Sequence, residues 1–445
     1  MEIIALLQCL TPVLTTTTLR QFGRIIFALL AMTGRVTMLG LSRWTGQGGS
    51  YRTVQRWFST AMAWPPLFVL FFRRHLFRPN SVYILAGDEV VVTKAGKHTF
   101  GLDCFFHGVL QKMVPALSFF VLSLVSVSEH CAFPLRVEQV VRMSAEKAAQ
   151  KAKAEAAKAP SPPRKPGRPK GSKGRREVIL TPELQRIQAM LQATLRSLAG
   201  WLPLTYLVLD GHFGNHNALH MVRQCGLHLI SKFRSDVALY RPYEGPCAKR
   251  GARRKYGDRV AGRQLPDQYL KQRTVERGLE TRVYQATLLH QEFAQALNVV
   301  IVVKTNLQTQ AWARVILFSS DLTLAWDKLT AYYHLRFQIE FNFRDAKQYW
   351  GLEDFMNVTE TAVTNAANLS LFMVNVSACL RQQLRPEEAE FGILDLKAYY
   401  RGRKYVTETL KLLPQKPDES LIAQILFVIA GLGSIHPVPT RSASP

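Results

Sequence analysis

The chain has 445 residues, 47% of them hydrophobic, which is enough for two or three domains with a sizeable core. Lys and Arg number 57 against 32 Asp and Glu, and the resulting net charge of +25 indicates a polyanionic partner. The six cysteines lack CxxC or Cys/His spacing, which argues against a zinc site or a disulfide framework and favours a reducing cytoplasm. No apolar run predicts a membrane span or an export signal.

Residues 1–80 are predicted to be helical, with a helix–turn–helix pattern in their second half. A short helix ends near Trp44, a glycine turn follows, and Ser50 is placed to cap a second helix. The predicted apolar face of that helix is Tyr51, Val54, Trp57 and Phe58. Its outward face consists of Arg52, Gln55 and Arg56. A recognition helix that enters the DNA major groove places its base-contacting residues in the same way. A plain helical hairpin with a solvated basic face is the alternative.

From residue 81 the sequence favours β-structure, with runs at 81–92, 98–107 and 116–128 that predict a meander. A helical stretch is expected from Leu135. It leads into an Ala/Lys-rich and then Pro-rich segment, 144–180, whose composition does not favour a packed core.

A short motif in this basic segment, Arg164-Lys165-Pro166-Gly167-Arg168-Pro169-Lys170-Gly171, resembles the AT-hook. AT-hooks are extended peptides whose Gly-Arg-Pro core lies in the narrow, strongly negative minor groove of A·T-rich DNA. The candidate DNA contacts are Arg164, Lys165, Arg168 and Lys170. The alternative is a flexible linker that binds phosphates without sequence preference.

The rest of the chain alternates between helix and strand signals. A helix is predicted over Pro182–Leu198 and a buried strand over Leu204–Leu209, which ends on Asp210. Another strand is expected over Leu227–Phe233 and more strands up to Ser320. Helices are expected after Trp326 and over Thr361–Leu384, followed by a C-terminal region with a disordered Pro/Ser tail.

The stretch from Tyr333 to Lys347 contains no Pro or Gly, so it predicts one helix of at least four turns that stops at Gly351. At about 100° per residue, Tyr333, Arg336, Glu340 and Lys347 share one face. Beside them lies an apolar stripe formed by Leu335, Ile339, Phe343, Ala346 and Trp350. Such a helix could line an active site, or it could be an ordinary amphipathic helix with charge pairs.

Three carboxylates have positions that suit metal-dependent chemistry. Asp88 follows a strand-like run, Asp210 ends a buried strand, and Glu340 lies on the helix with Arg336. Phosphoryl transfer at DNA can use two divalent cations held by oxygen ligands from separate elements. A single carboxylate at a strand end is more often a turn or cap residue, but three in so basic a chain favour a catalytic site.

The spacing Tyr333-x2-Arg336-x3-Glu340-x6-Lys347 resembles the Y-(2)-R-(3)-E-(6)-K signature of the DDE transposases of bacterial insertion sequences, in the cut-and-paste group. Gly87-Asp88, Asp210-Gly211-x-Phe213 and Gly351-Leu352 extend the resemblance. It implies an α/β fold with an RNase H-like core, a mixed sheet flanked by helices, in which Asp88, Asp210 and Glu340 bind two Mg²⁺ ions that Mn²⁺ can replace. It further implies that Tyr333, Arg336 and Lys347 contact DNA.

The resemblance also implies a domain organisation and partners. The expected segments are a helical DNA-binding domain at 1–80, two parts of the core at 81–143 and 181–234, the basic linker at 144–180, a β-rich insertion at 235–320, core helices with Glu340 at 321–385, and a C-terminal helical region with its tail at 386–445. The expected partners are double-stranded DNA and a second copy in a synaptic dimer, in a bacterial cytoplasm near the nucleoid. An inactive DNA-binding derivative and a nuclease without strand transfer remain alternatives.

Overall fold

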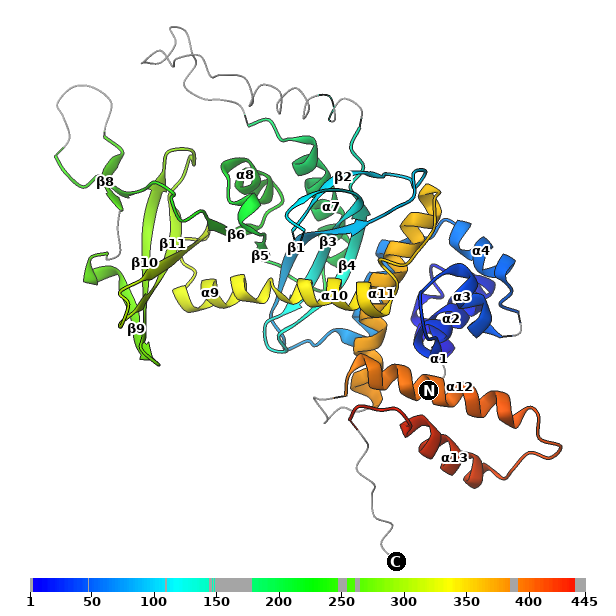
Figure 1. Ribbon diagram of the computed structural model, residues 1–445. Helices are drawn as coiled ribbons and strands as arrows, with labels where there is room; N and C mark the ends of the chain where they lie inside the picture. Colours follow the sequence, from blue (N-terminus) through cyan, green and yellow to red (C-terminus); the bar gives the residue numbers. More distant parts are fainter. Residues whose placement is uncertain are drawn as a thin grey trace, which may run out of the picture.

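A computed structural model describes residues 3–46, 48–108, 110–143, 178–246, 254–260, 265–384 and 391–436, with Glu146 and Ala148. The molecule is a mixed α/β protein in which a large sheet is flanked by helices (Figure 1), as the sequence predicts. The AT-hook-like residues Arg164, Lys165, Arg168 and Lys170 lie outside the described residues, as does most of the predicted C-terminal tail.

Over the described residues the sheet has twelve strands, and its first part includes a mixed arrangement of five in the order β4-β3-β1-β5-β6. β1 is antiparallel to β3 and parallel to β5, which is parallel to β6. These strands are β1 (Tyr83–Thr93), β3 (Lys112–Ser126), β4 (Cys131–Gln139), β5 (Tyr206–Val208) and β6 (His228–Phe233). Parallel pairing of β1 with β5 places the same ends of both strands at one edge.

The sheet continues past β6 through antiparallel strands in the order β12-β11-β10-β7-β8, with β9 also paired to β10. Their bounds are β7 (Leu239–Pro242), β8 (Tyr256–Val260), β9 (Leu270–Glu276), β10 (Leu279–His290), β11 (Leu297–Asn306) and β12 (Trp312–Ser319). A 3₁₀ turn, η4 (Asp267–Tyr269), precedes β9. Strong runs of β-branched residues, such as LNVVIVVKTN in β11, explain why β10, β11 and β12 could be predicted.

Two local predictions in the first part of the sheet are wrong. The stretch from Leu135 is not helical but belongs to β4, because Phe133 and Val137 pair with β3 and Leu135 is buried at a bulge between them. The three runs from residue 81 also do not form a simple meander. In a meander, β2 (Asp103–His107) would lie between β1 and β3. Instead, β3 pairs directly with β1, and β2 pairs with β3.

The N-terminal segment is helical, as predicted, and has the expected short helix, glycine turn and second helix. Its elements are α1 (Ile3–Leu7), η1 (Gln8–Leu10), α2 (Thr16–Ala31), α3 (Met38–Thr45), α4 (Tyr51–Ser59), α5 (Trp64–Phe71) and η2 (Phe72–Leu76). The Ser50 side chain caps α4 by accepting a hydrogen bond from the Thr53 N–H. Tyr51 was expected on the apolar face but is 46% exposed. It is the first residue of α4, and the buried residues of that helix begin only at Val54.

These N-terminal helices pack on α11 (Glu360–Leu384) rather than standing apart. The Trp64 indole N–H donates to the Asn365 side chain at 2.8 Å, and the Asn365 amide donates in turn to the carbonyl of Phe58. Among the described helices, α11 is long and apolar enough to cross a membrane, but 89% of its most apolar window is buried inside the protein. α11 is therefore a buried helix of the core, and it is the central helix of this protein.

Of the remaining described helices, some pack on the sheet and others pack on helices. α9 (Trp326–Leu335) contacts β6 and β12, and α10 (Gln338–Tyr349) contacts β1 and β4, so the two cross the sheet one after the other (Figure 1). α7 (Pro182–Leu198), η3 (Gly211–Phe213) and α8 (His216–Gln224) lie between β4 and β6 in the chain. α12 (Ile393–Leu410) packs on α2 and on α13 (Glu419–Gly431).

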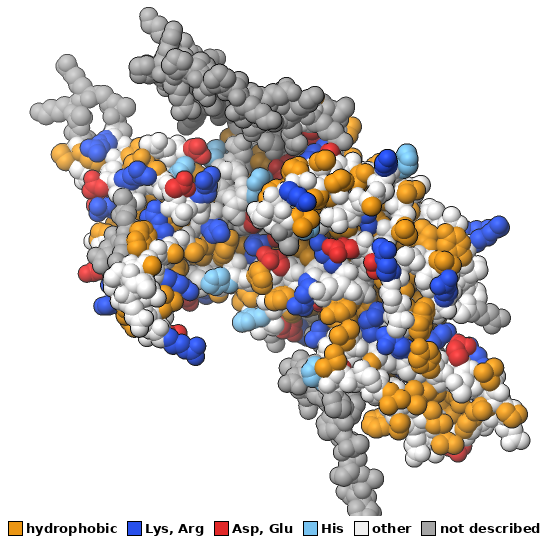
Figure 2. All heavy atoms as spheres, in the orientation of Figure 1, with side chains coloured by type: hydrophobic (Ala, Val, Ile, Leu, Met, Phe, Trp, Pro, Cys, Tyr) orange, Lys and Arg blue, Asp and Glu red, His pale blue; other side chains and the backbone are white. Residues whose placement is uncertain are grey.

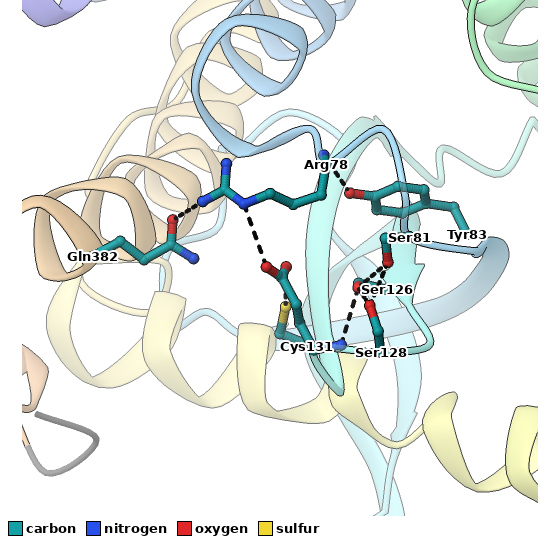
Figure 3. A network of polar contacts seen from close by, with 8 residues as sticks. Arg78, Ser81, Tyr83, Ser126, Ser128, Cys131 and Gln382 are labelled. Atoms are coloured by element: carbon teal, nitrogen blue, oxygen red, sulfur yellow. Dashed lines mark hydrogen bonds and ion pairs between the residues drawn. The ribbon is translucent and has the colours of Figure 1, made fainter. Parts of the chain in front are cut away.

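A polar network around Arg78 joins the helical segment to the sheet (Figure 3). The Arg78 guanidinium donates to Gln382 on α11 at 2.9 Å and pairs with Glu129 in the β3–β4 turn at 3.5 Å. Its backbone N–H donates to the Tyr83 hydroxyl at the start of β1. The start of the strand that carries Asp88 is thus fixed to the central helix.

Candidate active site

Asp88 and Asp210 lie side by side because of the register of two parallel strands. Ala86 on β1 is paired with Val208 on β5, and each aspartate comes two residues after its member of that pair. Since side chains alternate along a strand, both carboxylates leave the same face of the sheet. Gly87 allows this close pairing, because a Cβ there would lie 2.9 Å from the Leu209 side chain.

The Asp210 carboxylate also shapes the turn that follows it. Its Oδ1 accepts a hydrogen bond from the His212 N–H at 3.1 Å and so caps η3. The Ser231 hydroxyl donates to the Asp210 carbonyl at 2.7 Å, which ties the end of β5 to β6. Asp210 is therefore both a cap residue and a member of the carboxylate pair.

The stretch from Tyr333 to Lys347 is not one continuous helix, contrary to the prediction. α9 ends at Leu335 and α10 begins at Gln338. Across the joint the backbone bonds are of the i→i−3 type, such as Arg336 N–H to Tyr333 O at 3.3 Å and Glu340 N–H to Phe337 O at 3.0 Å. No Pro or Gly marks this joint, so the sequence carried no signal for it.

The apolar stripe of this stretch is buried as predicted: Leu335, Ile339, Phe343, Ala346 and Trp350. α10 ends before Gly351, which has a φ of +84° and is the expected stop. Gly351 has a second role, because a Cβ at this position would lie 2.4 Å from Val36 in the α2–α3 connection. Asn342, expected on the wet face, is buried.

Arg336 joins two of the three predicted catalytic acids. One terminal nitrogen of its guanidinium donates to Asp88 Oδ2, and the other donates to Glu340 Oε1 at 3.1 Å. Asp88 and Arg336 are 248 positions apart in the sequence, so folding alone brings them together. The Arg336 side chain is 13% exposed, against 21% for Asp88 and 43% for Glu340.

Burial and neighbouring charges set the electrostatics of this cluster. Burial raises the pKa of Asp88 to about 6; the Arg336 guanidinium and the Glu89 N–H lower it, whereas Asp210 and Glu340 raise it. Burial also raises the pKa of Tyr333, with Arg336 acting in the opposite direction and Asp210 in the same one. The carboxylates and Tyr333 are thus close enough to act on one another, with Arg336 among them.

Lys347 is on α10, and its side chain reaches β1 beyond Asp88. Its Nζ donates to the Val91 carbonyl at 3.0 Å and pairs with Glu353 at 3.0 Å. Lys94, just after β1, donates to the carbonyls of Glu353 and Phe355 and lies over the Phe355 ring. These contacts fix the loop after α10 against the strand that carries Asp88.

Carboxylate oxygens suit a hard cation such as Mg²⁺. The register of β1 with β5 brings two carboxylates to one face of the sheet, from Asp88 within β1 and from Asp210 just after β5. Within the ranges that the structure describes, however, no group of three or more His, Cys, Asp or Glu side chains is placed to hold a metal ion. Asp88 and Glu340 are instead joined through the Arg336 guanidinium. The donor atoms fit a divalent cation, and a positively charged side chain already lies between two of them.

The predicted recognition residues are exposed on α4 and are not brought to the carboxylates. Arg52, Gln55 and Arg56 face solvent, while Val54, Trp57 and Phe58 pack inward. The Trp57 ring stacks on Phe22 of α2 with centroids 5.5 Å apart. The structure therefore presents a basic outer face on α4, at a separate place from α10 (Figure 1).

A cavity of about 530 Å³ lies beside the site and was not predicted. It is lined by Glu89, Glu183, Arg186 and His212, among others, and Glu89 reaches it because it follows Asp88 and points to the opposite face of β1. His212 lies within η3, the turn that Asp210 caps. Its imidazole pairs with Glu183 at 3.6 Å, and this contact raises the pKa of His212. The side chain of His212 is thus engaged with α7.

Comparison with known protein families matches much of the chain. The family model of a DDE superfamily endonuclease matches residues 6–296, a region that contains Asp88 and Asp210 and ends before α9. Glu340 lies beyond the match, and in the structure it is joined to Asp88 through the Arg336 guanidinium. No curated protein is significantly similar to the chain. The match covers more than half of the sequence, and the chain therefore belongs to the DDE superfamily endonucleases.

Proposed function

We propose that the protein is a transposase of the cut-and-paste insertion-sequence group, with an RNase H-like core formed by β4-β3-β1-β5-β6. It would bind the terminal repeats of its element, cleave at the element's ends and join the resulting 3′-hydroxyls to target DNA. The observation that carries this proposal is that Arg336 donates to both Asp88 and Glu340, while strand register brings Asp210, two residues after β5, next to Asp88. The spacing from Tyr333 to Lys347 supports the same family group.

In this proposal Asp88, Asp210 and Glu340 would hold two Mg²⁺ ions, or Mn²⁺ in their place. Such ions stabilise charge on the attacking and leaving oxygens of a phosphodiester. The Asp88 and Asp210 carboxylates leave one face of the sheet, and the Glu340 side chain on α10 is 43% exposed. Tyr333, Arg336 and Lys347 are proposed to contact that backbone, since a hydroxyl and two cations suit phosphate oxygens.

Separate basic surfaces would recognise DNA. We propose that Arg52, Gln55 and Arg56 on α4 enter the major groove of the terminal repeat. Arg164, Lys165, Arg168 and Lys170 are proposed to add minor-groove contacts at A·T-rich DNA. A net charge of +25 supports a polyanionic partner in general and leaves the choice between these surfaces to experiment.

We also propose a homodimer that uses the apolar outer face of α13. This helix has the sequence ESLIAQILFVIAG, with no Lys or Arg, and Leu421, Phe427 and Val428 are largely exposed. Figure 2 shows hydrophobic side chains gathered over this part of the molecule. Two chains of charge +25 repel each other, so an uncharged apolar face favours contact with a second copy over contact with DNA.

Cleavage of DNA that carries the inverted repeats flanking the coding region tests the proposal. With Mg²⁺, the wild-type chain is expected to nick this DNA, and Asp88→Asn or Glu340→Gln to lower the rate at least about a hundredfold while binding is retained. Asp345→Asn is the matched control, because Asp345 lies on the same helix as Glu340 but pairs with Arg344. Equal cleavage by wild type and both site variants would refute the assignment.

The same assay separates the alternatives. Joining of the cleaved 3′ ends to a second DNA identifies a transposase, whereas cleavage without joining identifies a nuclease. Binding without cleavage by the wild type, over a range of Mg²⁺ and Mn²⁺ concentrations, would identify an inactive DNA-binding derivative.

A further inference from the structure

We propose that Arg336 acts as an internal counter-ion that holds the carboxylate site closed to divalent cations until the guanidinium moves away. This inference rests on the proposed function. It assigns to Arg336 a role before DNA cleavage, in addition to any contact with the DNA backbone.

The contacts of Arg336 are those of a cation between two metal-ligand candidates. Its terminal nitrogens donate to Asp88 Oδ2 and Glu340 Oε1, one to each acid. A divalent ion bound by the same acids would compete for these oxygens, because a carboxylate that accepts from an arginine has less electron density to offer a metal. The other Asp88 oxygen, Oδ1, already accepts from the Glu89 N–H at 2.8 Å. Arg336 and the metal therefore compete for one position.

Other basic groups near the site are directed elsewhere. Lys347 binds the Val91 carbonyl and Glu353, and His212 pairs with Glu183. Arg344, on the same helix as Glu340, pairs with Asp345 and lies over the Phe341 ring. Within the part of the chain that the structure describes, the cation paired with Asp88 and Glu340 is therefore Arg336.

The position of Arg336 in the backbone suits a side chain that changes partners. It stands at the joint between α9 and α10, where i→i−3 bonds replace the regular helical pattern. Its Nε is buried without a hydrogen-bond partner among the described residues, so the guanidinium is only partly satisfied in this arrangement. Leaving the site for a phosphate would therefore not break a fully satisfied network.

Binding of Mn²⁺ to the full-length protein without DNA, followed by electron paramagnetic resonance, tests the inference directly. Arg336→Gln is expected to bind Mn²⁺ about tenfold more tightly than wild type, because the competing charge-assisted hydrogen bonds are gone. Arg336→Lys, a point charge that cannot bridge both acids, is expected to fall between them. Arg344→Gln is the matched control and should bind as wild type does.

A second readout covers loss of folding. Without metal, Arg336→Gln is expected to unfold at a lower temperature than wild type, because Asp88 and Glu340 then lack a counter-ion, and Mn²⁺ should raise its Tm more than that of wild type. An unchanged Mn²⁺ affinity in Arg336→Gln, with wild-type binding abolished by Asp88→Asn, overturns this inference alone. Mn²⁺ binding that Asp88→Asn and Asp210→Asn leave unaltered overturns the proposed function, and the inference with it.

Discussion

Asp88 and Asp210 stand at equivalent positions on adjacent parallel strands, each two residues beyond the pair formed by Ala86 and Val208. Their proximity follows from strand register, and anything that changes the spacing of β1 and β5 should therefore change the site. Gly87 controls that spacing, because a side chain there would meet Leu209 and Phe120, each at 2.9 Å.

Gly87→Val is expected to destabilise the fold by about 1–3 kcal/mol through overpacking. It should lower cleavage further than the loss of folded protein explains, because Asp88 moves relative to Asp210. Urea unfolding and cleavage by the folded fraction measure the two effects. Gly96→Ala is the control, since its added Cβ would meet only the Thr99 hydroxyl at 3.3 Å; a similar loss of cleavage in both variants would contradict the argument.

The exposed face of α4 should contribute phosphate and base contacts. Arg52→Ala or Arg56→Ala is expected to weaken binding to terminal-repeat DNA and, if the residue contacts phosphate, to reduce the slope of log K against log salt by about 1. Gln55→Ala should mainly lower the preference for the repeat over unrelated DNA. Titrations at several salt concentrations measure both, and Arg35→Ala, whose partner is Asp354, is the control.

The AT-hook-like motif makes a prediction of its own. Arg168→Ala is expected to weaken binding to A·T-rich duplexes more than binding to G·C-rich duplexes, because the narrow minor groove attracts the arginine. Lys173→Ala, in the same basic segment but outside the motif, should lower both affinities alike. Equal losses for the two duplexes in Arg168→Ala would indicate a linker that binds phosphates without preference.

Lys397 predicts a pH dependence of stability. Burial lowers its pKa from 10.5 to about 8, with Arg401 acting in the same direction, and its Nζ donates to the Leu29 carbonyl at 2.7 Å. Between about pH 8 and 10 the unfolded chain binds more protons at this residue, so this contribution to stability rises with pH. Relative to Lys397→Met, the wild type should gain in free energy of unfolding from pH 8 to 10. A constant difference would contradict the lowered pKa.

The apolar face of α13 should govern self-association. Phe427→Glu is expected to shift the protein from dimer to monomer, because it places a charge where two copies would bury apolar surface. Light scattering coupled to size exclusion measures the mass. Leu412→Glu is the control, since Leu412 is also exposed but lies before α13. A wild-type monomer at all concentrations, in the presence of terminal-repeat DNA as well, would refute the proposed interface.

Much of the fold and part of the site could be predicted because their signals are local. Ser50 as a helix cap, the helix Pro182–Leu198 and the stop at Gly351 all depend on residues within a turn or two. The strands of β10, β11 and β12 were visible in their runs of β-branched residues. Asp210 could be placed at a strand end because the apolar run Leu204–Leu209 directly precedes it.

The tertiary structure decided what depends on distant neighbours. The stretch from Leu135 is part of β4 because the residues on both sides of Leu135 pair with β3. The helix predicted from Tyr333 to Lys347 is interrupted at Arg336, whose guanidinium reaches Asp88. The periodicity of a helix or strand shows which of its faces is apolar. It does not show that Arg336 will contact Asp88, which lies 248 positions away in the sequence. The sequence by itself thus determined the acids of the candidate site, and packing alone decided that an arginine lies between two of them.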